Sequence, residues 1–170
     1  MSTGESVVSA VQAALSEDSH DHSMFRAACS LAFFCFLRVS EFTCSGSFDP
    51  LVHLSISDVS FDTSGCLYLF IKTSKTDSFR RGVSLSIGAS GKRICAVSAV
   101  RRYLQVRGMF VFVLSDDGSP LTPVVVYCWF RAMLSNFGIR GTYSSHSFRI
   151  GAATTEVSAG IPDHLIKTLG

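Results

Sequence analysis

The chain of 170 residues is long enough for one domain with a substantial hydrophobic core. Hydrophobic residues make up 47% of it and charged residues only 16%, which excludes a disordered chain. The net charge of +2 is unevenly distributed, because residues 64–110 carry nine Lys and Arg against one acidic residue, whereas residues 1–63 carry two against eight. This basic block predicts a surface that binds a polyanion, although a solvated basic surface would have the same composition.

The most apolar segment, AACSLAFFCFL at 27–37, raises the question of a membrane span. It lies between Arg26 and Arg38 and is far shorter than the roughly 20 residues that a transmembrane helix needs. We therefore predict a buried core helix and no association with a membrane. The N-terminal residues lack a basic segment followed by a long apolar run, so no signal peptide is expected.

The six cysteines are widely scattered, and no two of them have the spacing of a CxxC motif. This pattern predicts an intracellular protein with reduced cysteines, without a disulfide framework or a zinc site. The sequence HDH at 20–22 could hold a metal ion, but we expect it to be a set of solvated polar residues before a helix.

Apolar periodicity predicts that most of the chain is helical. Helices are expected at 6–15, from Met24 to about Phe42, at 95–107, from Pro123 to about Phe137, from about Ser144, and from about Pro162. Ser23 and Thr122 are the expected N-caps of the second and fourth of these helices. The second helix is apolar on nearly every face, so it should be central in the fold.

A small antiparallel sheet is predicted between these helices. Residues 51–61 are expected to form a strand that leads to a turn at 62–65. The clearest pair of strands is CLYLFIK at 66–72 and GVSLSIG at 82–88, the second of which alternates apolar residues with serine. The polar and basic segment TSKTDSFRR at 73–81 connects them as a long hairpin loop. The predicted fold class is therefore α+β, mostly helical with a small antiparallel sheet and a β-hairpin.

Arg38 and Glu41 stand three residues apart near the end of the apolar helix, so their side chains are neighbours. A helix-end ion pair is the simplest interpretation. However, an arginine on so apolar a helix should be at least half buried, where a guanidinium needs full pairing. One carboxylate engages only two or three of its five donors, so we expect donors to remain for an anion.

His146 and Arg149 form a second pair with the same spacing, in the first turn of a predicted helix. The N-terminus of a helix favours an anion, and the small residues Gly151 to Ala153 would let this helix approach Arg38. Lys75 is predicted to stand at the tip of the basic hairpin, where it could reach over a ligand.

Two arginines, a histidine and a lysine suit phosphoryl transfer without a metal ion. Arginine forks match the oxygens of a phosphoryl group, and a lysine or a histidine can move protons to and from it. The sequence shows no acidic cluster with metal-binding spacing and no glycine-rich phosphate loop, which argues against a two-metal nuclease.

Four motifs in this order, AFFCFLRVSEFT, IKTSKTD, SSHSFRIGAATT and IKTLG, resemble the tyrosine recombinases, also called the phage integrase family. The resemblance extends from about residue 24 to 170. The combination HSFRIGAATT and GIPDHLIKTLG is most similar to the eukaryotic mobile-element branch, the recombinases of retrotransposons and Crypton-like transposons. FDP at 48–50 and DGSPLT at 117–122 also resemble that branch.

The resemblance implies catalytic roles for Arg38, Lys75, His146 and Arg149, with Glu41 as the supporting acidic residue. It implies that the family's tyrosine attacks a DNA phosphate to form a 3′-phosphotyrosyl link, with no metal ion and no cofactor. The partner is double-stranded DNA, on which the family assembles as a tetramer. The expected DNA-binding residues lie in and beside the hairpin loop: Lys72, Ser74, Thr76, Arg80 and Arg81. Arg131 and Arg140 are weaker candidates.

The family's nucleophilic tyrosine follows the segment that ends here at Gly170, and all four tyrosines of the chain precede His146. We therefore expect residues 23–170 to be a catalytic domain that lacks its C-terminal segment, after a leader or residual helix at 1–22. We expect this chain to be inactive alone and monomeric, and to be nuclear if it comes from a eukaryotic mobile element. The alternatives are a non-catalytic DNA-binding module derived from a recombinase, and an RNA- or protein-binding domain.

Overall fold

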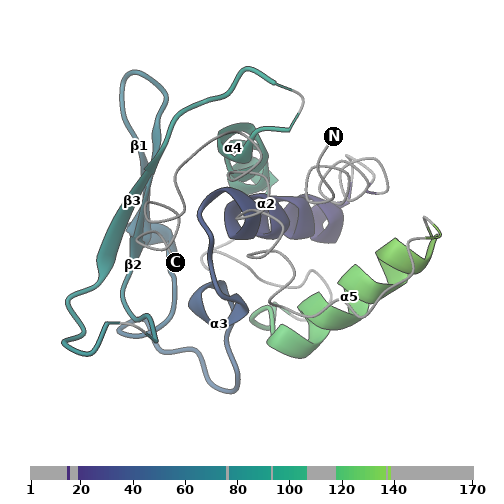
Figure 1. Cartoon of the computed structure of the whole chain (residues 1–170), viewed down its shortest axis with the longest axis horizontal. Helices are drawn as coiled ribbons and strands as arrows, with labels where there is room; N and C mark the ends of the chain where they lie inside the picture. Colours follow the sequence, from purple (N-terminus) through teal and green to yellow (C-terminus); the bar gives the residue numbers. More distant parts are fainter. Residues whose placement is uncertain are drawn as a thin grey trace, which may run out of the picture.

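The fold places its described helices against one face of a small antiparallel sheet (Figure 1). The computed structural model describes residues 15, 19–75, 77–92, 94–106, 118–136 and 138. These residues form four α-helices, one 3₁₀ helix and three strands, which confirms the predicted α+β class. The core lies between the sheet and the helices, where Leu67, Leu69 and Ile71 of the central strand are buried.

The central helix is α2, His20–Phe34, and almost every residue from Ser23 to Phe33 is buried. Its N-cap is Ser19, whose hydroxyl accepts a hydrogen bond from the backbone N–H of His22 at 3.4 Å. The helix therefore begins before the predicted cap, Ser23, which is buried inside it. The HDH sequence forms its first turn rather than preceding the helix, and Asp21 there is favourable to the helix dipole.

The predicted single helix over 24–42 is divided in the structure. After α2 the chain turns at Phe36, which has a positive φ of 55°, and the backbone N–H of Leu37 donates to the carbonyl of Ala32 at 3.2 Å. A second, short helix α3 follows at Val39–Phe42. Phe36 and Leu37 are both buried at this turn.

The sheet has the order β1-β2-β3, with β1 at Val59–Phe61, β2 at Leu67–Ile71 and β3 at Val83–Ile87. Both pairings are antiparallel, and Leu69 lies opposite Val59 on one side and Leu85 on the other. The predicted strand pair is confirmed. The prediction of one strand over 51–61 was wrong, because residues 51–53 form a turn and a 3₁₀ helix η1, Ile56–Asp58, precedes β1.

Helix α4, Ala96–Val106, packs against α2 with Val97, Val100 and Tyr103 buried, as the apolar pattern predicts. Helix α5, Pro123–Asn136, begins after Thr122, whose hydroxyl accepts from the backbone N–H of Val125 at 3.3 Å. This confirms the predicted cap. The helices expected at 6–15 and from about 144 onward, and the apolar run at 110–114, lie outside the described residues, apart from Leu15.

All six cysteines are among the described residues, and none of them forms a disulfide. Burial raises the pKa of Cys29, and it raises the pKa of Cys35 to about 12, so both are protonated thiols at neutral pH. Within the part of the chain that the structure describes, no helix has the length and apolarity needed to cross a membrane.

Phe25 of α2 is fully buried in the hydrophobic core and packs edge-on against Trp129 of α5, with ring centroids 5.5 Å apart. We expect Phe25→Ala to lower the free energy of unfolding by about 3–5 kcal/mol, because it removes a large buried side chain. Phe34→Ala on the same helix is the control, since Phe34 is exposed, and it should cost far less. Denaturant unfolding followed by the emission of the single tryptophan measures both; equal losses would contradict the assignment of this core.

Candidate functional site

Arg38 is the N-cap of α3, and its position is fixed by Glu41 one turn further on. The backbone N–H of Arg38 donates to Oε2 of Glu41 at 2.8 Å, and Nη1 of its guanidinium donates to Oε1 at 3.3 Å. The Glu41 side chain is 8% exposed and that of Arg38 is 21% exposed. The carboxylate therefore holds both ends of the arginine, and the guanidinium stays partly open to solvent.

Ser74 joins the β2–β3 hairpin to this ion pair. Its hydroxyl donates to Oε1 of Glu41 at 2.7 Å and accepts from Nη1 of Arg38 at 3.3 Å. Ser74 lies more than thirty residues along the chain from Arg38 and from Glu41, so this is a tertiary contact that the sequence spacing does not reveal. Sequence analysis assigned Ser74 to DNA contact; the structure places its hydroxyl between the charged groups of Arg38 and Glu41.

Lys72, two residues before Ser74, donates hydrogen bonds to three acceptors within the protein. Its ammonium donates to the carboxylate of Asp58, to the carbonyl of His53 at 3.1 Å and to the hydroxyl of Ser55 at 3.1 Å. These acceptors match the three donors of a lysine. Lys72 therefore attaches the end of β2 to the turn and 3₁₀ helix before β1, and sequence analysis missed its partner Asp58.

Lys75 is exposed and directly follows Ser74, so the chain carries it past the Arg38–Glu41 pair as it leaves β2. The sequence predicted Lys75 at the tip of the hairpin, but the tip is formed by the residues after it. There the backbone N–H of Asp77 donates to the carbonyl of Ser74 at 3.0 Å, and that of Arg80 donates to the carbonyl of Asp77 at 3.2 Å. Lys75 thus stands at the base of the loop, beside the ion pair.

The tip of the hairpin loop, residues 77–82, is organised by the carboxylate of Asp77. That carboxylate accepts from the backbone N–H of Gly82 at 2.7 Å. This hydrogen bond, with further ones from the backbone of Arg81, Phe79 and Arg80, lowers the pKa of Asp77 below its usual value. Because its pKa is low, the carboxylate is ionised at neutral pH and continues to accept these hydrogen bonds from the loop backbone.

The basic block of the sequence does not form a single face. Lys72 pairs with Asp58, and Arg80 and Arg81 are exposed at the hairpin tip. Arg101 of α4 stacks over the ring of Phe61, 4.8 Å from its centroid, beside the end of β2 that lies opposite the hairpin loop. Since β2 has five residues, these two ends of the sheet are about 17 Å apart. Among the described cations of the block, Lys75, Arg80 and Arg81 are exposed in the hairpin loop, whereas Lys92, Arg101 and Arg102 are exposed outside it.

The structure brings Arg38, Glu41, Ser74 and Lys75 together, as four of the predicted site residues. His146, Arg149 and Thr76 lie outside the described residues. Among the residues that the structure does describe, no three His, Cys, Asp or Glu side chains gather as they would around a metal ion. The site thus presents cations and a shared carboxylate, an arrangement that suits a phosphate oxygen.

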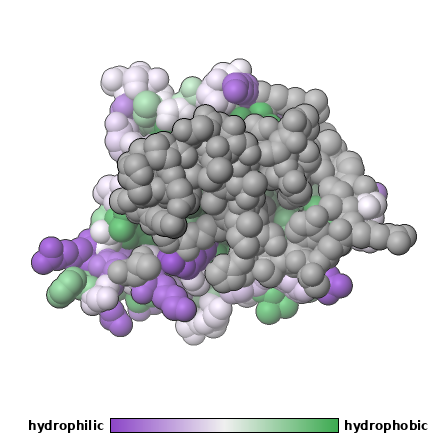
Figure 2. Space-filling model, viewed as in Figure 1, coloured by the Kyte–Doolittle hydropathy of each residue, from purple (hydrophilic) through white to green (hydrophobic). Residues whose placement is uncertain are grey.

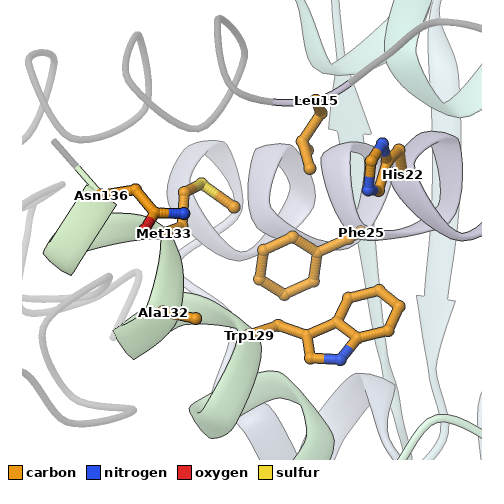
Figure 3. A pocket seen from close by; sticks show the side chains of 7 residues that line it. All are labelled: Leu15, His22, Phe25, Trp129, Ala132, Met133 and Asn136. Carbon is orange, nitrogen blue, oxygen red and sulfur yellow. The ribbon is translucent and has the colours of Figure 1, made fainter.

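A second concave feature lies between α2 and α5, with a volume of about 270 Å³ (Figure 3). The adjacent rings of Phe25 and Trp129 form part of its lining, and His22 and Asn136 are polar residues at its ends. It opens beside the first half of α2, whereas Arg38 follows the other end of that helix. Since fifteen helical residues extend about 22 Å, this cavity is separate from the Arg38 site.

Comparison with known proteins identifies the class to which this fold and site belong. The model of the phage integrase family matches residues 3–170. The chain therefore belongs to the phage integrase family, as its motifs indicated. A search of curated proteins gave no match.

Solved structures of recombinases share the fold at low sequence identity. The XerH site-specific recombinase bound to difH substrate has a TM-score of 0.70 at 17% identity, covering 98% of this chain and 44% of that one. The XerA recombinase has a TM-score of 0.70 at 22% identity, with 97% and 52% covered. FLP recombinase in a complex with a Holliday junction has a TM-score of 0.60 at 13% identity, with 98% and 41% covered. This chain thus spans about half the length of these structures.

The assignment of Lys72 as an internal lysine predicts its effect on stability. Lys72→Met should lower the free energy of unfolding by about 3 kcal/mol, because Asp58 then keeps a nearly buried charge without its cation. The double variant Lys72→Met with Asp58→Asn removes both charges and retains an acceptor for Ser55, so most of the loss should be recovered. Chemical denaturation of the three proteins measures this, and a purely additive loss would show that the pair is not coupled.

Proposed function

We propose that this chain is the DNA-binding catalytic core of a site-specific recombinase that breaks and rejoins DNA through a 3′-phosphotyrosyl intermediate. The observation that carries the proposal is the hydrogen-bonded arrangement of Arg38, Glu41 and Ser74, with Lys75 next in the chain. A guanidinium that donates to Glu41 and to Ser74 is preorganised, so it loses little freedom when it binds a phosphate. The membership of the phage integrase family supports the same reaction class.

The proposed roles follow from the chemistry of the groups. Arg38 binds nonbridging oxygens of the scissile phosphate and stabilises the charge that they gather during the reaction. Lys75 supplies a proton to the departing 5′ oxygen. His146 and Arg149 complete the phosphate pocket in this proposal, with His146 donating a hydrogen bond or moving a proton. No metal ion enters the proposed mechanism.

The nucleophile in this proposal is a tyrosine that is not among the four of these 170 residues. Tyr103 is fully buried between α4 and α2, and the hydroxyl of Tyr68 donates to Asp62 at 3.1 Å on the outer face of the sheet. Tyr127 is on α5, and its hydroxyl accepts from Arg131 at 3.4 Å. Tyr143 precedes the His146 motif, whereas the family's nucleophile follows it. The attacking tyrosine then comes from outside these residues, in this polypeptide or another.

The partner in this proposal is double-stranded DNA, bound through the hairpin cations Lys75, Arg80 and Arg81. The chain alone is monomeric, and a tetramer forms on DNA. The HSFRIGAATT motif supports an origin in a eukaryotic mobile element, which would place the protein in the nucleus. A non-catalytic DNA-binding module is the second candidate, because it needs the same hairpin cations and no tyrosine.

Salt dependence tests the DNA-binding surface. For a labelled duplex, log Kd should depend linearly on log salt, and the double variant Arg80→Ala with Arg81→Ala should reduce the slope by up to about 1.8, since each lost phosphate contact removes about 0.9. The matched control is Arg101→Ala with Arg102→Ala, an exposed arginine pair on α4. Its slope should stay close to that of the unmodified protein, and the reverse ranking would move the DNA surface to α4.

A nicked suicide duplex tests the assignment of the nucleophile. We expect no covalent protein–DNA adduct from these 170 residues on a denaturing gel. A chain extended by a helix that carries a tyrosine should form the adduct, and Arg38→Ala should abolish it. An adduct formed by the 170 residues themselves would show that one of their tyrosines attacks, and full activity of Arg38→Ala in the extended chain would remove Arg38 from the catalytic set and favour the non-catalytic module.

A further inference from the structure

The tip of the β2–β3 loop exposes a large apolar side chain between cations. Phe79 is 82% exposed and is followed by Arg80 and Arg81, both exposed. The guanidinium of Arg81 lies 5.4 Å from the centroid of the Phe79 ring. Figure 2 shows hydrophilic and hydrophobic side chains projecting together at the lower left, the corner where Figure 1 places this loop.

The loop holds this side chain in a defined place. The carboxylate of Asp77 accepts hydrogen bonds from the backbone that follows it, up to Gly82. Arg80 has a positive φ of 50°, a conformation that a non-glycine residue keeps only when its surroundings impose it. Gly82 has a φ of 71°, and a Cβ there would clash with the ring of Phe70, so the second leg of the loop is packed closely against β2. An exposed aromatic ring on a constrained loop is presented for contact with a partner.

The position of the tip relative to the site indicates what that partner is. Phe79 is four residues from Lys75, so the two lie at most about 14 Å apart. A duplex whose phosphate occupies the Arg38 site can therefore extend to the tip. The two arginines that follow Phe79 complement the phosphates of a nucleic acid backbone, whereas the phenyl ring can form no hydrogen bond with a base edge. Its favourable place on a duplex is between bases.

We propose that Phe79 is an apolar wedge that enters a base step of duplex DNA and unstacks it, while Arg80 and Arg81 bind the adjacent phosphates. This inference rests on the proposed function, because it requires a duplex at the hairpin end of the sheet. Unstacking the base step costs part of the binding free energy, and the wedge bends the duplex toward the protein. In this chain it would bring the phosphate that follows the opened step toward Lys75 and Arg38.

The test compares a matched duplex with the same duplex carrying one mismatched base pair, by fluorescence anisotropy with the full chain. A mismatch is already partly unstacked, so the unmodified protein should bind it about tenfold more tightly than the matched duplex. Phe79→Ser should bind the two duplexes equally, and Phe79→Leu should retain part of the preference. Arg80→Ala with Arg81→Ala should weaken both by a similar factor and keep the preference.

Leu51→Ser is the matched control, because Leu51 is also 82% exposed but lies in the turn before η1, without adjacent cations. It should leave the preference unchanged, and the same loss in this control would overturn the wedge. A mismatch preference that persists in Phe79→Ser would also overturn the wedge. A tip that inserts into lipid instead would bind vesicles of phosphatidylserine and phosphatidylcholine in a Phe79-dependent way, with no Phe79 effect on duplexes. Absence of salt-dependent binding to any duplex would instead refute the proposed function itself.

Discussion

The geometry of the site depends on one nearly buried carboxylate, that of Glu41. Its two oxygens accept hydrogen bonds from the backbone and guanidinium of Arg38 and from the hydroxyl of Ser74. A carboxylate that is 8% exposed is unfavourable without such donors, because it has lost most of its hydration. The donors come from the start of α3 and from the segment after β2, so satisfying this charge fixes the two elements relative to each other.

The hairpin is attached to the rest of the protein by three consecutive side chains. Lys72 binds the turn and 3₁₀ helix before β1, the hydroxyl of Thr73 donates to the carbonyl of Val52 at 3.2 Å, and Ser74 joins the Arg38 pair. Lys75 is the first residue beyond these attachments. Its side chain is exposed and flexible, whereas its backbone follows directly on these attached residues.

Cations with similar spacing in the sequence have different physical roles in the structure. The ammonium of Lys72 is used inside the protein, and the guanidinium of Arg101 covers an aromatic ring at the opposite end of the sheet. Arg80 and Arg81 are exposed on a loop whose shape is set by the charge of Asp77. The net charge of a segment therefore says little about a binding surface until the partners of each cation are known. Among the described residues, Lys75, Arg80 and Arg81 are exposed cations of the hairpin loop.

Those features that depend on local pattern could be predicted from the sequence. The apolar residues on all faces of α2 required a buried helix, the alternation in β3 required a half-buried strand, and the spacing of Arg38 and Glu41 made them neighbours. The four ordered motifs indicated the family, and the match over residues 3–170 confirmed it.

Tertiary structure alone decided where α2 ends, which residues pair with Lys72 and Ser74, and how the hairpin tip is shaped. Helix α2 ends at Phe34, and the chain then turns at Phe36, where both Phe36 and Leu37 remain buried. Lys72 finds Asp58, and Ser74 finds Glu41, because a charge withdrawn from water takes the nearest polar partner in space, and sequence spacing does not encode that distance. Sequence by itself determined the residue types of the candidate site; packing decided which of them are used inside the protein and which are exposed.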